Sequence, residues 1–269
     1  MSIKDILVHI DDSTAVESRL DLAIHYAQKH GANLRGLYPI THGFYESRDI
    51  NEQSGIERIS SIFKAKTVKA GISAEWVLFD SPVIGVSVTD IVTHQAYYSD
   101  LVIVGQSNFR TTGVNSPADL PERLVIACGR PVLVVPYTGL FETVGDRIMI
   151  SWKTGRESVR SLHDAMPHIK KSSYVTVIGI SEDEISPEGD SLFNSISSYL
   201  KYHSVDARTE QICTGKLTVG DEILNAVYEQ KIDLLVMGAC IPTLRGSLAL
   251  SPVAQHVLKH LTVPLLMSH

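Results

Sequence analysis

Short apolar runs alternate along the chain with longer segments in which apolar residues recur every three or four positions. The run at 5–10, DILVHI, is rich in branched residues and too short for a helix, so it predicts a strand. The residues that follow recur at helical spacing: Val16, Leu20, Ala23, Ile24 and Ala27. Ser13 is the expected start of this helix, and Gly31 is its expected end.

The same alternation continues to residue 136. Further strands are expected at 33–40, 73–79, 100–105 and 131–136. One intervening helix is marked by Ile56, Ile59, Ile62 and Phe63 and another by Val88, Ile91 and Val92, and one more helix precedes the last strand. Strands that alternate with helices predict right-handed crossovers and a parallel sheet covered on both faces.

The second half of the chain repeats the first. DLVIVGQ at 100–106 returns as DLLVMGA at 233–239, and RPVLVVP at 130–136 returns as VPLLMSH at 263–269. The expected strands of the second half are 147–152, 173–180, 207–213, 233–238 and 263–268, with a helix marked by Val159, Leu162, Met166 and Ile169. A repeat of this length is a whole domain rather than a solenoid unit.

The pattern therefore predicts an α/β fold with two tandem open five-stranded parallel-sheet domains. We expect the first domain at 1–136, a linker at 137–146, and the second domain at 147–269. Sheets of this kind bind ligands beyond the carboxyl ends of their strands, where the strand order reverses. Residues that bind a ligand are therefore expected directly after the first and fourth strands of each half.

Composition narrows the function classes. Apolar residues make up 44% of the chain and charged residues 20%, which is typical of a soluble globular protein. The net charge is −6, and each half carries half of the basic and acidic residues, so neither nucleic acid nor a membrane is an expected partner. The first apolar run is too short for a signal peptide.

The three cysteines indicate a reducing compartment. Cys128, Cys213 and Cys240 are an odd number without a CxxC pair, which favours the cytoplasm and a role as buried thiols.

His256 and His260 lie four apart on the last expected helix, and His163 and His168 flank a proline on another; surface positions are favoured over metal sites for all four. The sequence holds no Walker loop, GxSxG or HExxH motif, so no catalytic set is expected.

Several segments resemble the universal stress protein family in its tandem two-domain form. They are ILVHIDDS at the start, SDLVIVGQ and IDLLVMGA, and PVLVVP and VPLLMSH at the ends of the halves. The resemblance implies an adenine-nucleotide α-hydrolase-like fold. In nucleotide-binding members a loop Gly-x-x-Gly, nine residues and Gly-Ser/Thr follows the fourth strand, and an acidic residue ends the first. Glycines of this kind let backbone N–H groups approach phosphate oxygens.

The first half keeps part of that pattern. Asp11 stands at the acidic position and Gly105 at the first glycine, but Asn108 stands where the second glycine belongs. Ala118 and Asp119 replace the Gly-Ser pair. We expect Asp119 to cap the next helix with its carboxylate and so to substitute for an anion, which lowers affinity for ATP. On this argument, Ala118→Gly with Asp119→Ser would increase that affinity.

The second half keeps less. Gly238 matches the first glycine, but Ile241 replaces the second, and Ser251 and Pro252 replace the Gly-Ser pair. Lys153 replaces the acidic residue. Any nucleotide is therefore expected in residues 1–136, with Asp11, Gly105 and Asn108 as the candidate contacts. Gly238 is the candidate binding residue of the second half. ATP binding is expected to be weak or absent, and the sequence identifies no other cofactor.

Three functions remain open. The first is a cytoplasmic stress-response protein that binds a small ligand, such as a nucleotide, and contacts other proteins without catalysis. The second is an enzyme of the same fold that hydrolyses or transfers nucleotides, and the third is a structural adaptor with closed pockets. Apolar edge strands need cover, and members of the universal stress protein family provide it by pairing their last strands across a pseudo-twofold axis. The resemblance therefore implies that 131–135 and 264–268 face each other as an intrachain pseudo-dimer, and that two chains can pair further as a homodimer.

Overall fold

The computed structural model describes residues 2–42, 50–81, 83–106, 117–141, 143–181, 187–242 and 247–269. Internal contacts divide the chain into two compact units, which we call the N-terminal unit (Ser2–Leu140) and the C-terminal unit (Phe141–His269). The limits of the expected linker at 137–146 stay a prediction. The expected pairing of strands 131–135 and 264–268 also stays a prediction, since it concerns the placement of one unit against the other.

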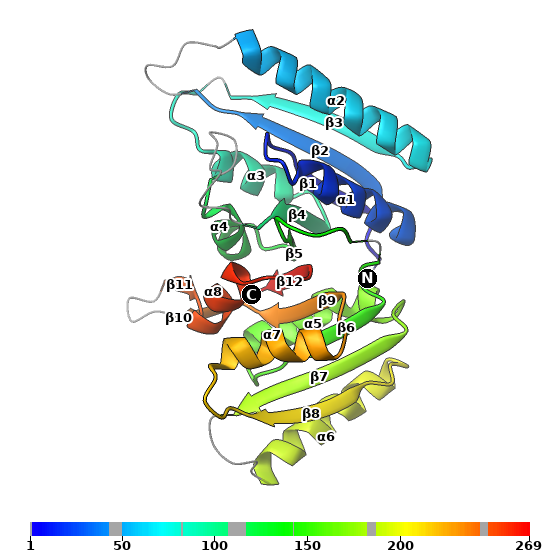
Figure 1. The fold of residues 1–269 in the computed structure, drawn as a ribbon, viewed down its shortest axis with the longest axis vertical. Helices are drawn as coiled ribbons and strands as arrows, with labels where there is room; N and C mark the ends of the chain where they lie inside the picture. Colours follow the sequence, from blue (N-terminus) through cyan, green and yellow to red (C-terminus); the bar gives the residue numbers. More distant parts are fainter. Residues whose placement is uncertain are drawn as a thin grey trace. The chain divides into compact units, whose positions relative to one another are not determined.

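The N-terminal unit is built on five parallel strands (Figure 1). They are β1 (Asp5–His9), β2 (Asn33–Ile40), β3 (Ala74–Asp80), β4 (Leu101–Gly105) and β5 (Val132–Val135). Their spatial order is β3-β2-β1-β4-β5, so the order reverses between β1 and β4. β1, β4 and β5 are buried along nearly their whole length, which explains why they read as continuous apolar runs.

Among the described residues of this unit, four helices cover the sheet. They are α1 (Val16–His30), α2 (Ile50–Ala70), α3 (Val88–Ala96) and α4 (Leu120–Ala127). α1 packs beside α2, and α3 beside α4. The chain moves along the sheet in one direction from β1 to β3 and in the other direction from β3 to β5. Because crossovers between parallel strands are right-handed, the two pairs of helices lie on opposite faces of the sheet.

The first helix differs at its start from the sequence expectation. Gly31 ends it in a left-handed conformation (φ 61°), as predicted. Its first residue is Val16, however, and the preceding Ala15 offers no side-chain cap, because the hydroxyl of Ser13 donates to Asp11 instead. The buried face of α1 also contains a cation, Arg19, which the apolar pattern alone does not mark.

The C-terminal unit repeats the topology. Its parallel strands are β6 (Arg147–Ser151), β7 (Tyr174–Ser181), β8 (Arg208–Cys213), β9 (Leu234–Gly238) and β12 (Leu265–Ser268), in the order β8-β7-β6-β9-β12. Its helices are α5 (Arg156–Ile169), α6 (Pro187–Tyr202), α7 (Val219–Glu229) and α8 (Pro252–Lys259). The predicted tandem α/β fold with two five-stranded parallel sheets is therefore confirmed.

Four details of the C-terminal unit differ from expectation. The segment between β9 and α8 contains an antiparallel hairpin, β10 (Cys240–Pro242) with β11 (Leu248–Leu250), where a simple loop was expected. Val159 is exposed on α5, whereas Ser158 and Ser161 face the core. His168 is buried rather than on the surface. Cys213 is exposed, while Cys128 and Cys240 are buried thiols as predicted.

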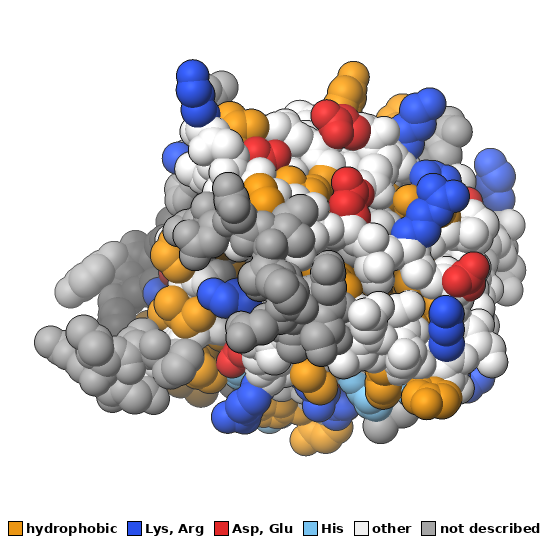
Figure 2. All heavy atoms as spheres, turned by 90° about the horizontal axis from the view of Figure 1, so that it is seen from below, with side chains coloured by type: hydrophobic (Ala, Val, Ile, Leu, Met, Phe, Trp, Pro, Cys, Tyr) orange, Lys and Arg blue, Asp and Glu red, His pale blue; other side chains and the backbone are white. Residues whose placement is uncertain are grey.

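On the face seen in Figure 2, basic, acidic and apolar side chains are interspersed. Among the described residues, no helix is long and apolar enough to cross a bilayer.

Candidate ligand site

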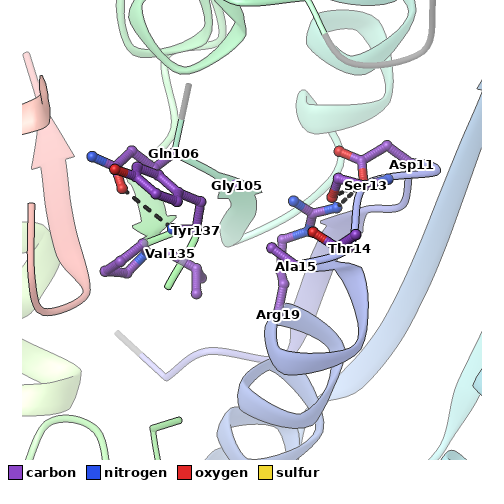
Figure 3. Close-up of a pocket in the computed structure, with 10 residues that line it drawn as sticks. Asp11, Ser13, Thr14, Ala15, Arg19, Gly105, Gln106, Val135 and Tyr137 are labelled. Carbon is purple, nitrogen blue, oxygen red and sulfur yellow. Dashed lines mark hydrogen bonds and ion pairs between the residues drawn. The ribbon is translucent and has the colours of Figure 1, made fainter. Parts of the chain in front are cut away.

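The reversal between β1 and β4 brings two of the predicted residues to one cavity. Asp11 follows β1 by two residues and Gly105 ends β4, its neighbour in the sheet. Both line a cavity of about 30 Å³, together with Ser13, Thr14, Arg19 and Tyr137. Figure 3 shows Asp11, Ser13 and Arg19 on one side of it and Gln106 and Tyr137 on the other.

The carboxylate of Asp11 accepts hydrogen bonds from neighbouring groups of the same chain. Arg19 Nη2 donates to Asp11 Oδ1 at 2.7 Å, and the backbone N–H and hydroxyl of Ser13 donate to the same oxygen at 3.1 and 2.6 Å. Asp11 and Arg19 are each only 2% exposed. The pair is therefore a buried, hydrogen-bonded ion pair at the position where this sheet type binds ligands.

The surroundings of Asp11 favour its charged form. Burial alone raises the pKa of the carboxyl group, but the charge of Arg19, then His9, and the hydrogen bonds from Ser13 and Arg19 outweigh burial. The net effect holds the pKa of Asp11 well below its ordinary value. His9 is fully buried, and its Nδ1 lies 3.8 Å from Asp11 Oδ2.

The position of the Arg19 side chain explains why residue 105 is a glycine. A side-chain carbon at residue 105 would collide with Arg19 Nη1, so glycine is needed there for the guanidinium to lie against the end of β4. On the far wall, the side-chain oxygen of Gln106 accepts the N–H of Tyr137 at 3.2 Å. A single guanidinium group thus spans the crevice from Asp11 to Gly105.

The corresponding crevice of the C-terminal unit is closed by backbone. An added carbon at Gly238 would lie 2.7 Å from the carbonyl carbon of Glu157 and 2.8 Å from the nitrogen of Ser158, both in the first turn of α5. Lys153, which replaces the acidic residue, is exposed. Gly238 therefore allows helix and strand to pack closely, and no ligand is needed to account for it.

Similarity to known proteins is found at the level of three-dimensional structure. No protein-family model and no curated protein matches the chain. A universal stress protein from Archaeoglobus fulgidus DSM 4304 superposes with a TM-score of 0.74 at 15% identity, and covers 98% of this chain and 97% of its own. A functionally unknown protein from Pseudomonas aeruginosa PAO1 superposes with a TM-score of 0.65 at 15% identity, over 99% of this chain and 92% of its own.

The chain has the universal stress protein fold. It has that fold twice, as the sequence resemblance implied, and the likeness extends over nearly the full length of both chains in each comparison. At this level of identity the comparison establishes architecture, and the site has to be judged on its own residues.

The loop positions of the universal stress protein pattern have mixed outcomes. Asn108 lies outside the described residues, as does the rest of 107–116. Asp119 stands at the N-cap of α4 as predicted, but its side chain makes no capping hydrogen bond. Its carboxylate instead accepts from Arg123 Nε at 2.5 Å, at the surface. The prediction that Asp119 substitutes for an anion at the helix end is therefore wrong, and the proposed gain of ATP affinity loses its basis.

The second loop also follows local structure rather than the universal stress protein pattern. Ser251 caps α8 through its hydroxyl, which accepts the N–H of Ala254 at 3.1 Å, and Pro252 occupies the first helical position. Ile241 lies in β10 and is 43% exposed. These residues end a hairpin and start a helix.

A wider hollow of about 640 Å³ lies between the N-terminal ends of α7 and α8. His256 lines it, and its Nε2 lies 2.9 Å from Asp221 Oδ1, so this histidine links the two helices. Hydrogen bonds from the side chain and backbone of Thr218, then from His256, lower the pKa of Asp221. Within the described ranges, no group of three or more metal-ligating side chains is found.

Arg19 is the residue of the candidate site that sequence reasoning missed. It falls between Val16 and Leu20 on the apolar stripe of α1, so a charged residue stands at a position predicted to be buried. Charged residues are seldom fully buried without a partner. That conflict was the available signal, and the nearest buried carboxylate, Asp11, was the available partner.

Proposed function

We propose that this chain is a non-catalytic binding protein of a cytoplasmic stress response, which acts through a small ligand and through contacts with other proteins. The universal stress protein fold, present in both units, supports this class of function. One observation carries the proposal: Asp11 and Gly105 line a single cavity at the reversal of strand order in the N-terminal unit. That unit is the better candidate for the ligand, and an adenine nucleotide is the expected reference compound.

Affinity for ATP is expected to be weak or absent. Arg19 already satisfies Asp11, and the remaining cavity of about 30 Å³ has room for one or two water molecules but not for a nucleoside. The groups that could hold a ribose or base are thus engaged within the chain.

The test uses the purified full-length chain. It is denatured, the released small molecules are identified by mass spectrometry, and calorimetric titrations follow with ATP, ADP and AMP in magnesium buffer. We expect no nucleotide affinity tighter than about 0.1 mM, which corresponds to roughly −5.5 kcal/mol. Phosphate release from ATP that scales with protein concentration and is lost in Asp11→Asn would show an enzyme instead.

A further inference from the structure

One hydrogen-bond donor in the candidate site has no acceptor. Arg19 is only 2% exposed, and its Nε is buried and makes no hydrogen bond within the described ranges of the chain. The other end of the same guanidinium is engaged, since Nη2 donates to Asp11 Oδ1 at 2.7 Å. A buried donor without a partner is costly to the folded state, so Nε calls for an acceptor.

The cavity of about 30 Å³ lies beside this donor. Arg19 lines it together with Ser13, Thr14 and Ala15, the residues that lead into α1 (Figure 3). The start of a helix presents N–H groups that have no acceptor within the helix, and it carries partial positive charge. The cavity is therefore bordered by donors, and its volume suits about one or two non-hydrogen atoms of a ligand.

The charges of the site favour a neutral acceptor over an anion. The positive charge of Arg19 is already balanced by Asp11, which is also 2% exposed. An anion that accepted from Arg19 Nε would bring a second negative charge close to a buried carboxylate, and buried charges without a partner are strongly unfavourable. A carbonyl oxygen accepts the same hydrogen bond and brings no net charge.

The outer wall of the cavity lies at the surface. Tyr137 lines the cavity and is 45% exposed, and residues 138–140 are exposed as well. The N–H of Tyr137 donates to Gln106 Oε1 at 3.2 Å, and the hydroxyl of Ser18 donates to the carbonyl oxygen of Gly139 at 3.0 Å. A ligand whose carbonyl oxygen enters the cavity can therefore place its remaining atoms against Tyr137.

We propose that this cavity binds the uncharged carbonyl oxygen of a small ligand, such as an amide or urea, and that Arg19 Nε is its donor. The proposal rests on the proposed function in placing the ligand position at the reversal of strand order. It narrows the ligand to compounds that bring a neutral acceptor. Neither an anionic group nor a group that only donates hydrogen bonds meets that requirement.

The experiment titrates the full-length wild-type chain with three probes of nearly the same shape. Acetamide offers a neutral carbonyl, acetate is an anion, and acetamidinium has donors only. Because such small fragments bind weakly, each titration extends to about 100 mM. The readout is the NMR signal of the Nε–H of Arg19, which is assigned through its bonds to the Arg19 backbone.

We expect acetamide to move the Arg19 Nε–H signal in a saturable way, acetate to move it less, and acetamidinium to leave it unchanged. The backbone N–H signals of Gly105 and Tyr137, at the walls of the cavity, should follow the acetamide titration. The N–H signal of Gly238, where α5 closes the corresponding crevice, should not.

A pair of variants tests the role of the donor. Arg19→Lys keeps the charge but has no N–H at the position of Nε, so Gly105 and Tyr137 should no longer respond to acetamide. The matched control is Arg123→Lys, which alters an exposed ion pair with Asp119 and should keep both responses. If Arg19→Lys does not fold, the wild-type titration decides the question by itself.

Two outcomes overturn the proposal. If the Arg19 signal shows no saturable response to acetamide, the cavity holds water only. If acetate or acetamidinium gives an equal or larger response, the site does not select a neutral acceptor. Tight binding or turnover of ATP would refute the proposed function without changing the acetamide result, so the two failures are distinguishable.

Discussion

At the scale of single residues, Asp11 and Arg19 form a buried pair in which each partner depends on the other. Both side chains are nearly fully withdrawn from water, and their contact is a charge-assisted hydrogen bond. The net contribution of such a pair is small relative to apolar residues of the same shape. Removal of one partner alone, however, typically costs about 3–5 kcal/mol because a buried charge is left uncompensated.

We therefore expect Asp11→Asn to lower the free energy of unfolding by about 3–5 kcal/mol at pH 7. The asparagine keeps the shape of the side chain but leaves Arg19 without its counter-charge. Asp119→Asn is the matched control, because it weakens an exposed pair with Arg123 and should cost less than about 1 kcal/mol. Urea unfolding of both variants measures the difference, and similar losses in the two would contradict this account.

The same pair predicts a pH dependence. Because the pKa of Asp11 is lowered in the folded state, its stabilisation is fully present above the unfolded-state pKa, near 3.8, and is lost as pH falls through the folded-state pKa. The gap in stability between wild type and Asp11→Asn should stay constant from pH 8 to about pH 5 and narrow below about pH 4. Urea unfolding across this range checks it, and a gap that narrows between pH 7 and pH 5 would show that another group titrates.

At the scale of elements, the two equivalent glycines face different obstacles. A carbon added at Gly105 meets the end of a side chain, whereas one added at Gly238 meets the backbone of α5. A side chain can move aside, but a helix backbone moves only with everything packed on it.

Gly238→Ala should therefore destabilise the chain by about 1–3 kcal/mol, as overpacking of a core does. Gly215→Ala is the matched control, since an added carbon there has no neighbour within 4 Å. Urea unfolding of both variants gives the comparison. If Gly238→Ala is as mild as the control, α5 does not rest on β9 as closely as described.

The helix ends give a second pair of variants. Ser251 accepts an N–H of α8, whereas Asp119 makes no capping bond to α4. We expect Ser251→Ala to cost about 1 kcal/mol and Asp119→Ala less than half of that. Thermal unfolding of the two alanine variants measures this, and equal losses would restore a capping role to Asp119.

The elements that the sequence predicted correctly are those decided by local pattern. Buried parallel strands such as 101–105, LVIVG, appear as apolar runs. Gly31 ends a helix because it adopts a left-handed conformation. The hairpin of β10 and β11 was missed because its strands are three residues long, too short for any period. The partner of Asp11 was missed because a pattern of apolar positions does not show which buried cation meets which carboxylate.

At the scale of the whole molecule, one topology has been used twice with different results at its ligand position. The N-terminal unit has a buried carboxylate, Asp11, and the side chain of Arg19 fills its crevice. The C-terminal unit has a lysine instead and closes its crevice with a helix backbone. Duplication of the fold therefore does not imply two equivalent sites.

This asymmetry predicts that a crevice ligand binds once per chain. In full-length Arg19→Ala, methylguanidinium should replace the missing guanidinium group beside Asp11. Calorimetry should then give a stoichiometry near one, and hydrogen exchange should slow at the ends of β1 and β4 but not of β6 and β9. Adding Lys153→Asp restores an acidic residue to the C-terminal unit but leaves the first turn of α5 against Gly238, so the stoichiometry should not change. A second site that appears with Lys153→Asp would show that charge, and not the close packing of α5 on β9, is what closes the C-terminal crevice.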